Sequence, residues 1–127
     1  MLANQGQAAE LVNISDIAAR TATFQSSWFD VRKYEGDILI MQEVGVVSGT
    51  TPSLAGTFED ATDISGTGAA ALSGVAYTAV TASNSKQKLT IPAGNNRGFI
   101  RYVGTISGTT PSFTMGVTAL SHPKYTT

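Results

Sequence analysis

The hexapeptide SGTTPS occurs twice in this chain of 127 residues, at 48–53 and again at 107–112. The residues around it also match at the same offset of 59 residues, since Val47 aligns with Ile106 and Leu54 aligns with Phe113. The repeated unit therefore consists of a strand, a connection and a second strand. A chain that uses this unit twice is constrained to a fold rich in β-structure.

The residues of the hexapeptide suit a connection. Gly49 and Gly108 permit backbone angles that other residues avoid. Pro52 and Pro111 fix φ and cannot donate to a strand ladder, so each is expected to begin the next strand. The sequence thus predicts a hairpin around each copy, and we interpret the repeat as architecture, not as a reactive site.

Alternation with a period of two continues on either side of each copy. After the second copy, apolar residues alternate with small polar ones in the order Phe113, Thr114, Met115, Gly116, Val117, Thr118 and Ala119. Further strands are expected over residues 23–31, 76–83 and 86–92, with a loop over 59–76. Seven or eight strands with almost no helix predict an all-β fold, an antiparallel β-sandwich or jelly roll.

The first 23 residues differ from the rest, because they are rich in Ala, Gln and Asn. We divide the chain into a non-globular N-terminal arm, residues 1–23, and a sandwich domain, residues 24–127. Leu11, Val12 and Ile14 are expected to find cover on a neighbouring subunit. The alternative is a frayed terminus.

The charge balance excludes several kinds of partner. Eight Lys and Arg residues against nine Asp and Glu residues give a net charge of −1, which provides no basic surface for nucleic acid or an anionic membrane. The absence of cysteine excludes disulfides and thiolate metal sites. With no basic leader and no long apolar run, we expect synthesis in a cytoplasm and no membrane span.

Few residues could carry chemistry. His122 is the only histidine and is followed by Pro123, which favours a surface or interface position over a catalytic triad. Glu59, Asp60 and Asp63 lack the alternating spacing of a calcium loop, so we expect a solvated turn, with Asp63 forming an Asx turn.

Four further carboxylates are also explained by solvation; they are Asp30, Glu35, Asp37 and Glu43. The glycine-rich segment at 65–74 lacks the lysine of a phosphate-binding loop. We therefore predict no enzymatic activity, no catalytic residue, no cofactor and no bound metal. A small hydrolase is the weakest alternative.

Trp28 raises one binding hypothesis, because β-sandwich modules that bind carbohydrate display flat aromatic rings. The tyrosines are Tyr34, Tyr77, Tyr102 and Tyr125. However, Trp28 lies close to Phe24 and Phe29 in an expected strand, which favours a core or interface role.

Several segments together resemble a class of small structural proteins of tailed bacteriophages. These are VGVVSGTTPSL, FEDATD, RGFIRYVGTISGTTPSFTMGVTAL and the closing HPKY, and the resemblance covers residues 24–125. It implies a virion protein. Some members of this class are jelly-roll cement, or decoration, proteins, which bind the outer surface of the capsid and clamp neighbouring major capsid subunits, often as dimers or trimers.

The resemblance implies the major capsid protein as partner, a homo-oligomer, and a place on the capsid surface of the virion. The expected contact residues are Leu11, Val12, Ile14, Pro123, Lys124 and Tyr125. A head–tail connector, a tail protein and a carbohydrate-binding module remain alternatives.

Overall fold

The computed structural model describes residues 10–92 and 97–123, which form seven strands and no helix. The strands are β1 (Glu10–Arg20), β2 (Phe24–Gln25), β3 (Phe29–Asp30), β4 (Tyr34–Ala61), β5 (Ala70–Ala76), β6 (Ser85–Pro92) and β7 (Phe99–Pro123). Every pairing between these strands is antiparallel. The all-β class is confirmed, and the described part contains no helix that could cross a membrane.

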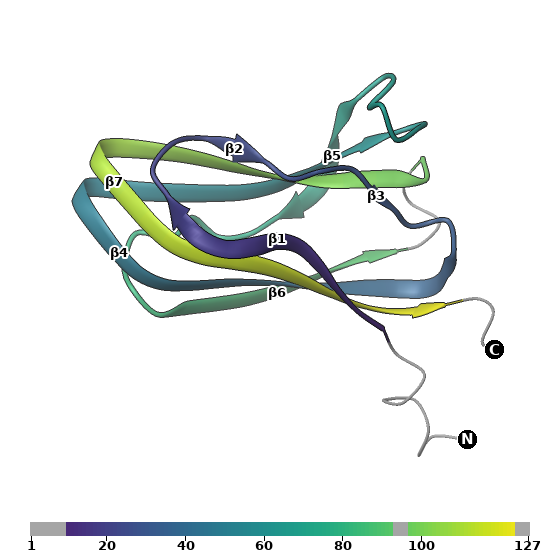
Figure 1. The fold of residues 1–127 in the computed structure, drawn as a ribbon, viewed down its shortest axis with the longest axis horizontal. Coiled ribbons are helices and arrows are strands. Elements are labelled where there is room, and N and C mark those ends of the chain that lie inside the picture. Colours follow the sequence, from purple (N-terminus) through teal and green to yellow (C-terminus); the bar gives the residue numbers. More distant parts are fainter. Residues whose placement is uncertain (1–9, 93–96, 124–127) are drawn as a thin grey trace, which may run out of the picture.

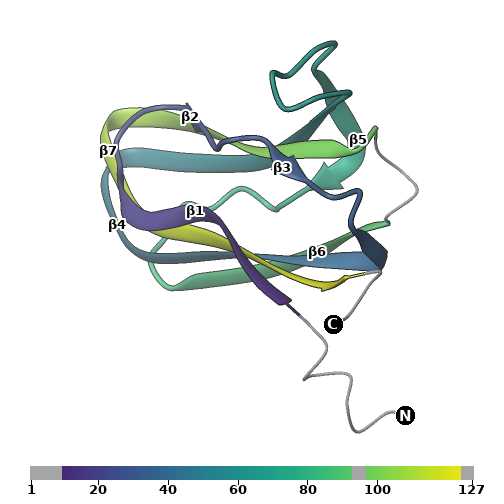
Figure 2. The same ribbon diagram turned by 45° about the vertical axis from the view of Figure 1, so that its right-hand side comes forward.

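Two long strands, β4 and β7, organise the whole molecule. They run side by side, bend together, and so contribute one half each to both layers of a sandwich (Figure 1). The β1/β6 layer has the order β1, the second half of β7, the first half of β4, and β6. The β3/β5 layer contains β2 and β3, then the first half of β7, the second half of β4, and β5 (Figure 2). This arrangement is a jelly roll.

The two hexapeptides pair with each other at the bend. Ser48 lies opposite Ser112, and Ser53 lies opposite Ser107. We call residues 48–53 and 107–112 the double corner. The predicted hairpins are therefore wrong, since each copy lies inside one continuous strand that crosses to the other layer. Local spacing does not distinguish a strand that turns back from one that bends away.

Glycine makes the double corner possible. Gly49 and Gly108 have φ angles of 113° and 116°, which residues with a side chain rarely adopt. A Cβ at Gly49 would lie 2.7 Å from the Thr110 carbonyl oxygen, and one at Gly108 would lie 2.8 Å from the Thr51 carbonyl oxygen. Each glycine thus faces the equivalent threonine carbonyl of the other copy, so the corner has approximate twofold symmetry.

The core fills the space between the layers. The predicted alternation in β7 is confirmed, because Phe113, Met115 and Val117 are buried. The Tyr102 ring packs at the centre, with the Phe58 ring 5.6 Å away in an edge-on arrangement.

A polar pair is enclosed in this core. The Tyr102 hydroxyl donates to Oε1 of Gln42 at 2.5 Å, and both side chains are fully buried. The Tyr77 hydroxyl donates to the Ile40 carbonyl at 2.7 Å. Gly56 leaves the space for the Gln42 amide, because a Cβ there would collide with Oε1. Burial raises the pKa of both tyrosines.

Two strand boundaries differ from those expected. β5 lies within the predicted loop 59–76, whereas the predicted strand 76–83 forms only an isolated bridge through Val80. The predicted strand 23–31 is divided into β2 and β3. In both places the alternation is short, and tertiary pairing decides which residues join the sheet.

The N-terminal segment also differs from the expectation. Residues 10–20, assigned to an arm from their composition, form β1 and pair with β7. Ile14 is buried in the core and Val12 packs against it, which ties the strand to the sandwich. β-Bulges near Ser15 interrupt the regular alternation that identifies a strand in a sequence. Residues 1–9 lie outside the described part.

Substitution of Gly49 by alanine tests the double corner. We expect Gly49→Ala to lower the free energy of unfolding by about 3 kcal/mol, from backbone strain and the collision across the corner. Gly74→Ala, with φ of 77° and open space around it, should cost about 1 kcal/mol. Gly45→Ala should stay within about 0.5 kcal/mol of wild type. Urea unfolding measures all three, and equal effects would contradict the interlocked corner.

The buried tyrosines predict loss of stability at high pH. Because burial raises the pKa of Tyr77 and Tyr102, their contribution is complete below the unfolded-state pKa of about 10 and falls as the pH rises above it. We expect phenolate absorbance and loss of β-sheet circular dichroism to develop together above about pH 10. If these two tyrosines ionised at an ordinary pKa while the protein stayed folded, the prediction would be contradicted.

Candidate interaction surface

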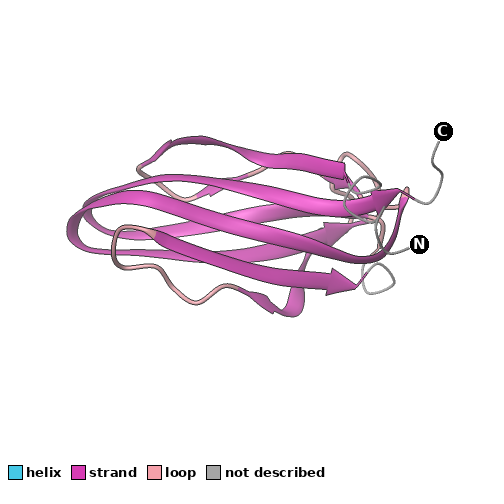
Figure 3. Cartoon of the chain, turned by 90° about the horizontal axis from the view of Figure 1, so that it is seen from below, coloured by secondary structure: helices cyan, strands magenta, loops and turns pink. Residues whose placement is uncertain are grey.

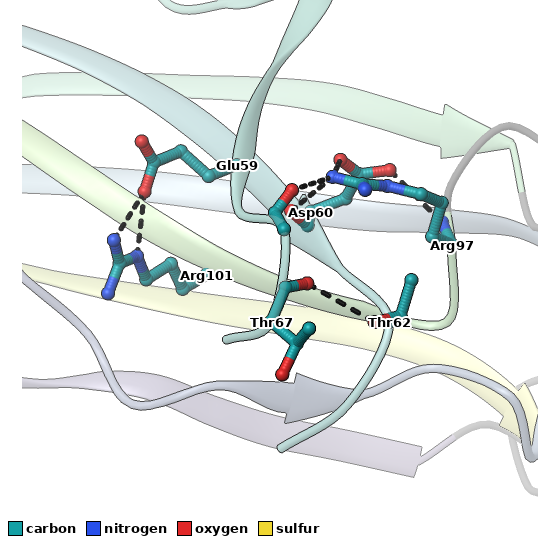
Figure 4. Close-up of polar contacts among 7 residues, drawn as sticks. Glu59, Asp60, Thr62, Thr67, Arg97 and Arg101 are labelled. Atoms are coloured by element: carbon teal, nitrogen blue, oxygen red, sulfur yellow. Dashed lines mark hydrogen bonds and ion pairs between the residues drawn. The ribbon is translucent and has the colours of Figure 1, made fainter. Parts of the chain in front are cut away.

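The acidic residues near the C-terminal end of β4 are held by arginines. Arg101 contacts Oε1 of Glu59 at 2.6 Å, and Arg97 contacts Oδ1 of Asp60 at 2.9 Å (Figure 4). Hydrogen bonding from Arg97 lowers the pKa of Asp60. Residues 10–92 and 97–123 contain no group of three His, Cys, Asp or Glu side chains placed to hold a metal.

The turn after β4 is closed by Asp63. Its Oδ1 accepts hydrogen bonds from the backbone N–H groups of Ser65 at 2.9 Å and Thr67 at 3.2 Å, so the predicted Asx turn is confirmed. The Thr67 carbonyl accepts from Thr62 (Figure 4). Hydrogen bonding from Thr67 lowers the pKa of Asp63. These carboxylate contacts are structural.

The other candidate side chains are not brought together in a cleft. Asp30 is paired with Arg32 at 3.0 Å in the β3/β5 layer, and Glu43 with Lys86 at 3.9 Å in the β1/β6 layer. His122 lies in β7, and its side chain is outside the description.

The aromatic rings do not form an open platform among the described residues. The Arg101 guanidinium lies 4.4 Å from the Trp28 ring. The loop after β4 also touches this ring, since a Cβ at Gly66 would lie 2.6 Å from Nε1. Three tyrosines are buried: Tyr34, Tyr77 and Tyr102. Tyr125 lies outside the described residues.

The outer face of the β1/β6 layer is a broader candidate (Figure 3). We call it the sheet face and define it by three rows that cross β1, β7, β4 and β6. The rows are Leu11, Leu120, Leu39 and Thr90; Asn13, Thr118, Met41 and Lys88; and Ile17, Gly116, Glu43 and Lys86. Leu11 is 69% exposed, Ile17 76% and Met41 39%. A sheet face that displays large apolar side chains among polar and charged ones suits protein–protein contact.

A shallow hollow of about 410 Å³ lies at one end of the sheet face. It forms where Gly45 and Gly116 lack side chains, and Ile17, Glu43 and Lys86 border it. Ile17 lies against Gly116, where a Cβ would come within 2.8 Å of its Cγ1. The hollow is open and brings together no pair of catalytic groups, so it is a surface feature and not an active site.

The double corner forms a second candidate surface, at the end of the sandwich where β4 and β7 bend (Figure 1). Residues 44–58 and 102–121 contain no charged residue. Thr50, Thr51 and Thr109 are exposed there. A surface without charge loses little hydration energy when another protein covers it.

The expected contact residues lie in different environments. Leu11 is on the sheet face, whereas Ile14 points into the core and Val12 packs against it. Pro123 ends β7, and Lys124 and Tyr125 lie outside the described residues.

The sequence reasoning did not single out the other apolar residues of the sheet face. These are Ile17, Leu39, Met41 and Leu120. The run Ile38–Met41 contains a signal, because a strand with apolar residues at four successive positions must place apolar side chains on both of its faces.

Comparisons with known proteins agree with the fold. No family model matches the chain, and no curated protein matches it. A chain from the structure of infectious bursal disease virus, Gx strain, is similar over 91% of this chain with a TM-score of 0.52 and 13% sequence identity. This chain corresponds to only 32% of that chain. At this identity the similarity shows a shared fold.

Asp60→Asn tests the structural role of the acidic residues. Because Arg97 lowers the pKa of Asp60, the pair stabilises the fold above the unfolded-state pKa of about 3.9, and this is lost as pH falls through the lower folded-state value. We expect the variant to unfold at a lower urea concentration at pH 7. Its free energy of unfolding should also change less as the pH falls. Glu43→Gln, in an exposed pair, is the matched control and should change neither. Equal behaviour of the two variants would contradict this role.

Proposed function

We propose that this chain is a structural virion protein, and more specifically a cement protein of a tailed bacteriophage. In this role it binds the outer surface of the head and clamps neighbouring major capsid subunits. The observation that carries the proposal is the uncharged double corner, the end of the jelly roll where the paired strands β4 and β7 bend together.

The distribution of polar contacts supports a binding role over catalysis. Arginines pair with the carboxylates at the end of β4, backbone N–H groups bind Asp63 in the turn after it, and the hydroxyls of Tyr77 and Tyr102 form hydrogen bonds inside the sandwich. The uncharged surface is then suited to contact with another protein. Capsids present many identical sites, so a weak contact made by several linked copies yields strong attachment.

The fold supports the same role. Jelly rolls recur in viral capsid proteins, and also in lectins and cupins. The similar chain comes from the structure of a virus. Among the alternatives, a carbohydrate-binding module is disfavoured because Arg101 and the loop at Gly66 cover Trp28.

The double corner is the surface that we assign to the capsid. Thr50 and Thr109 lie opposite each other at this end of the sandwich, and both are exposed. Lysine at both positions would introduce two charges that capsid binding must dehydrate.

Co-sedimentation with purified heads of the virus that encodes the chain tests this proposal. We expect saturable binding at a fixed ratio to the major capsid protein. Thr50→Lys/Thr109→Lys should weaken binding by about 100-fold, as expected for two charges desolvated at a contact. Ser73→Lys, exposed on β5, is the control and should bind like wild type. A few copies per particle would indicate a connector or tail protein instead, and no binding would contradict a virion role on the head.

A further inference from the structure

We infer that the sheet face binds the same face of a second copy, around a twofold axis parallel to the strands. The inference deepens the proposed function, in which the chain acts as a homo-oligomer, by assigning the interface. It leaves the double corner of each copy free for the capsid.

The apolar residues of the sheet face are complementary under this axis. A rotation about the strand direction places β1 over β6 of the second copy and β7 over its β4. Leu120 then meets Leu39 of the other copy, and Met41 meets Thr118, each pair occurring twice. Sheets that pack face to face in aligned orientation interdigitate their side chains in this way.

The charges select this axis. Asp16 lies at the β1 edge beside Ile17, whereas Lys86 and Lys88 lie at the β6 edge. The rotation places Asp16 of each copy over Lys86 of the other, in the same row. A twofold axis perpendicular to the strands, through the middle row, would instead place β6 over β6 and Lys88 over Lys88, which is repulsive.

The groups needed for these pairs are available. Lys86 is 81% exposed, and its contact with Glu43 in the same copy is 3.9 Å long. Asp16 accepts a hydrogen bond from Asn13 and keeps an exposed carboxylate. Arg20, the cation nearest to Asp16 in the chain, stacks on Phe24 at 4.4 Å. With Asp16 at its β1 edge, the three rows of the face carry two acidic and two basic side chains, Asp16 and Glu43 against Lys86 and Lys88, a balance that suits a self-complementary contact. Asp37 lies one row further along β4.

The size of the face sets the expected affinity. Four strands about 4.8 Å apart, over about six residues each, give roughly 400 Å² per copy. This is about half of what each partner buries in a standard interface. We therefore expect a dimer with a dissociation constant of about 100 μM, which forms when copies are concentrated on a shell.

Sedimentation equilibrium of the chain alone, from about 10 μM to 1 mM, tests the inference. Asp16→Lys and Lys86→Asp should each weaken dimerisation about tenfold, because each reverses two symmetric pairs. The double variant Asp16→Lys/Lys86→Asp should return to within about threefold of wild type, because the pairs re-form with exchanged charges. Met41→Lys should abolish association, whereas Thr105→Lys, exposed on the β3/β5 layer, should not change it.

Three results would overturn the inference. One is a wild-type chain that stays monomeric at the highest concentration. Another is self-association that Met41→Lys does not alter, and the third is a double variant no better than the single ones. Circular dichroism confirms that each variant is folded. Because no capsid is present, a negative result here leaves the co-sedimentation test of the cement role unaffected.

Discussion

The pairing of the two hexapeptides is the contact on which the rest of the structure depends. At the double corner two strands bend together. Gly49 and Gly108 have no side chain, so the backbone of the other copy can approach each bend closely. Both layers are built from the halves of these two strands. A change at the corner is therefore transmitted to the core and to both outer faces, although no apolar side chain of the core lies within it.

The same construction determines which groups are enclosed and which are exposed. Two layers joined by continuous strands close over buried rings, where the Tyr102 hydroxyl donates to Oε1 of Gln42 and the Tyr77 hydroxyl donates to the Ile40 carbonyl. Arginines pair with the carboxylates at the end of β4, and Asp63 closes the turn that follows. Two surfaces are open to partners: the uncharged double corner and the sheet face. They point in different directions, so both can be occupied at once.

The sequence predicts the fold class because alternation identifies buried strands such as the second half of β7. It does not identify pairing partners, since the residues after SGTTPS have the same pattern whether the strand returns or crosses to the other layer. β1 was missed because bulges near Ser15 disturb its alternation. Of the candidate contact residues, Leu11 lies on the sheet face, whereas Val12 and Ile14 are two residues apart and both face the core.

The long pairing of β4 with β7 also has a consequence for synthesis. Tyr34 pairs with Pro123, so one edge of β4 is not fully paired until synthesis has passed Pro123. During that interval the uncharged stretch at 44–58 is a candidate for pairing with other chains. Gly49 and Pro52 interrupt this stretch in its middle. The residues that shape the corner in the finished protein therefore act earlier as gatekeepers against aggregation.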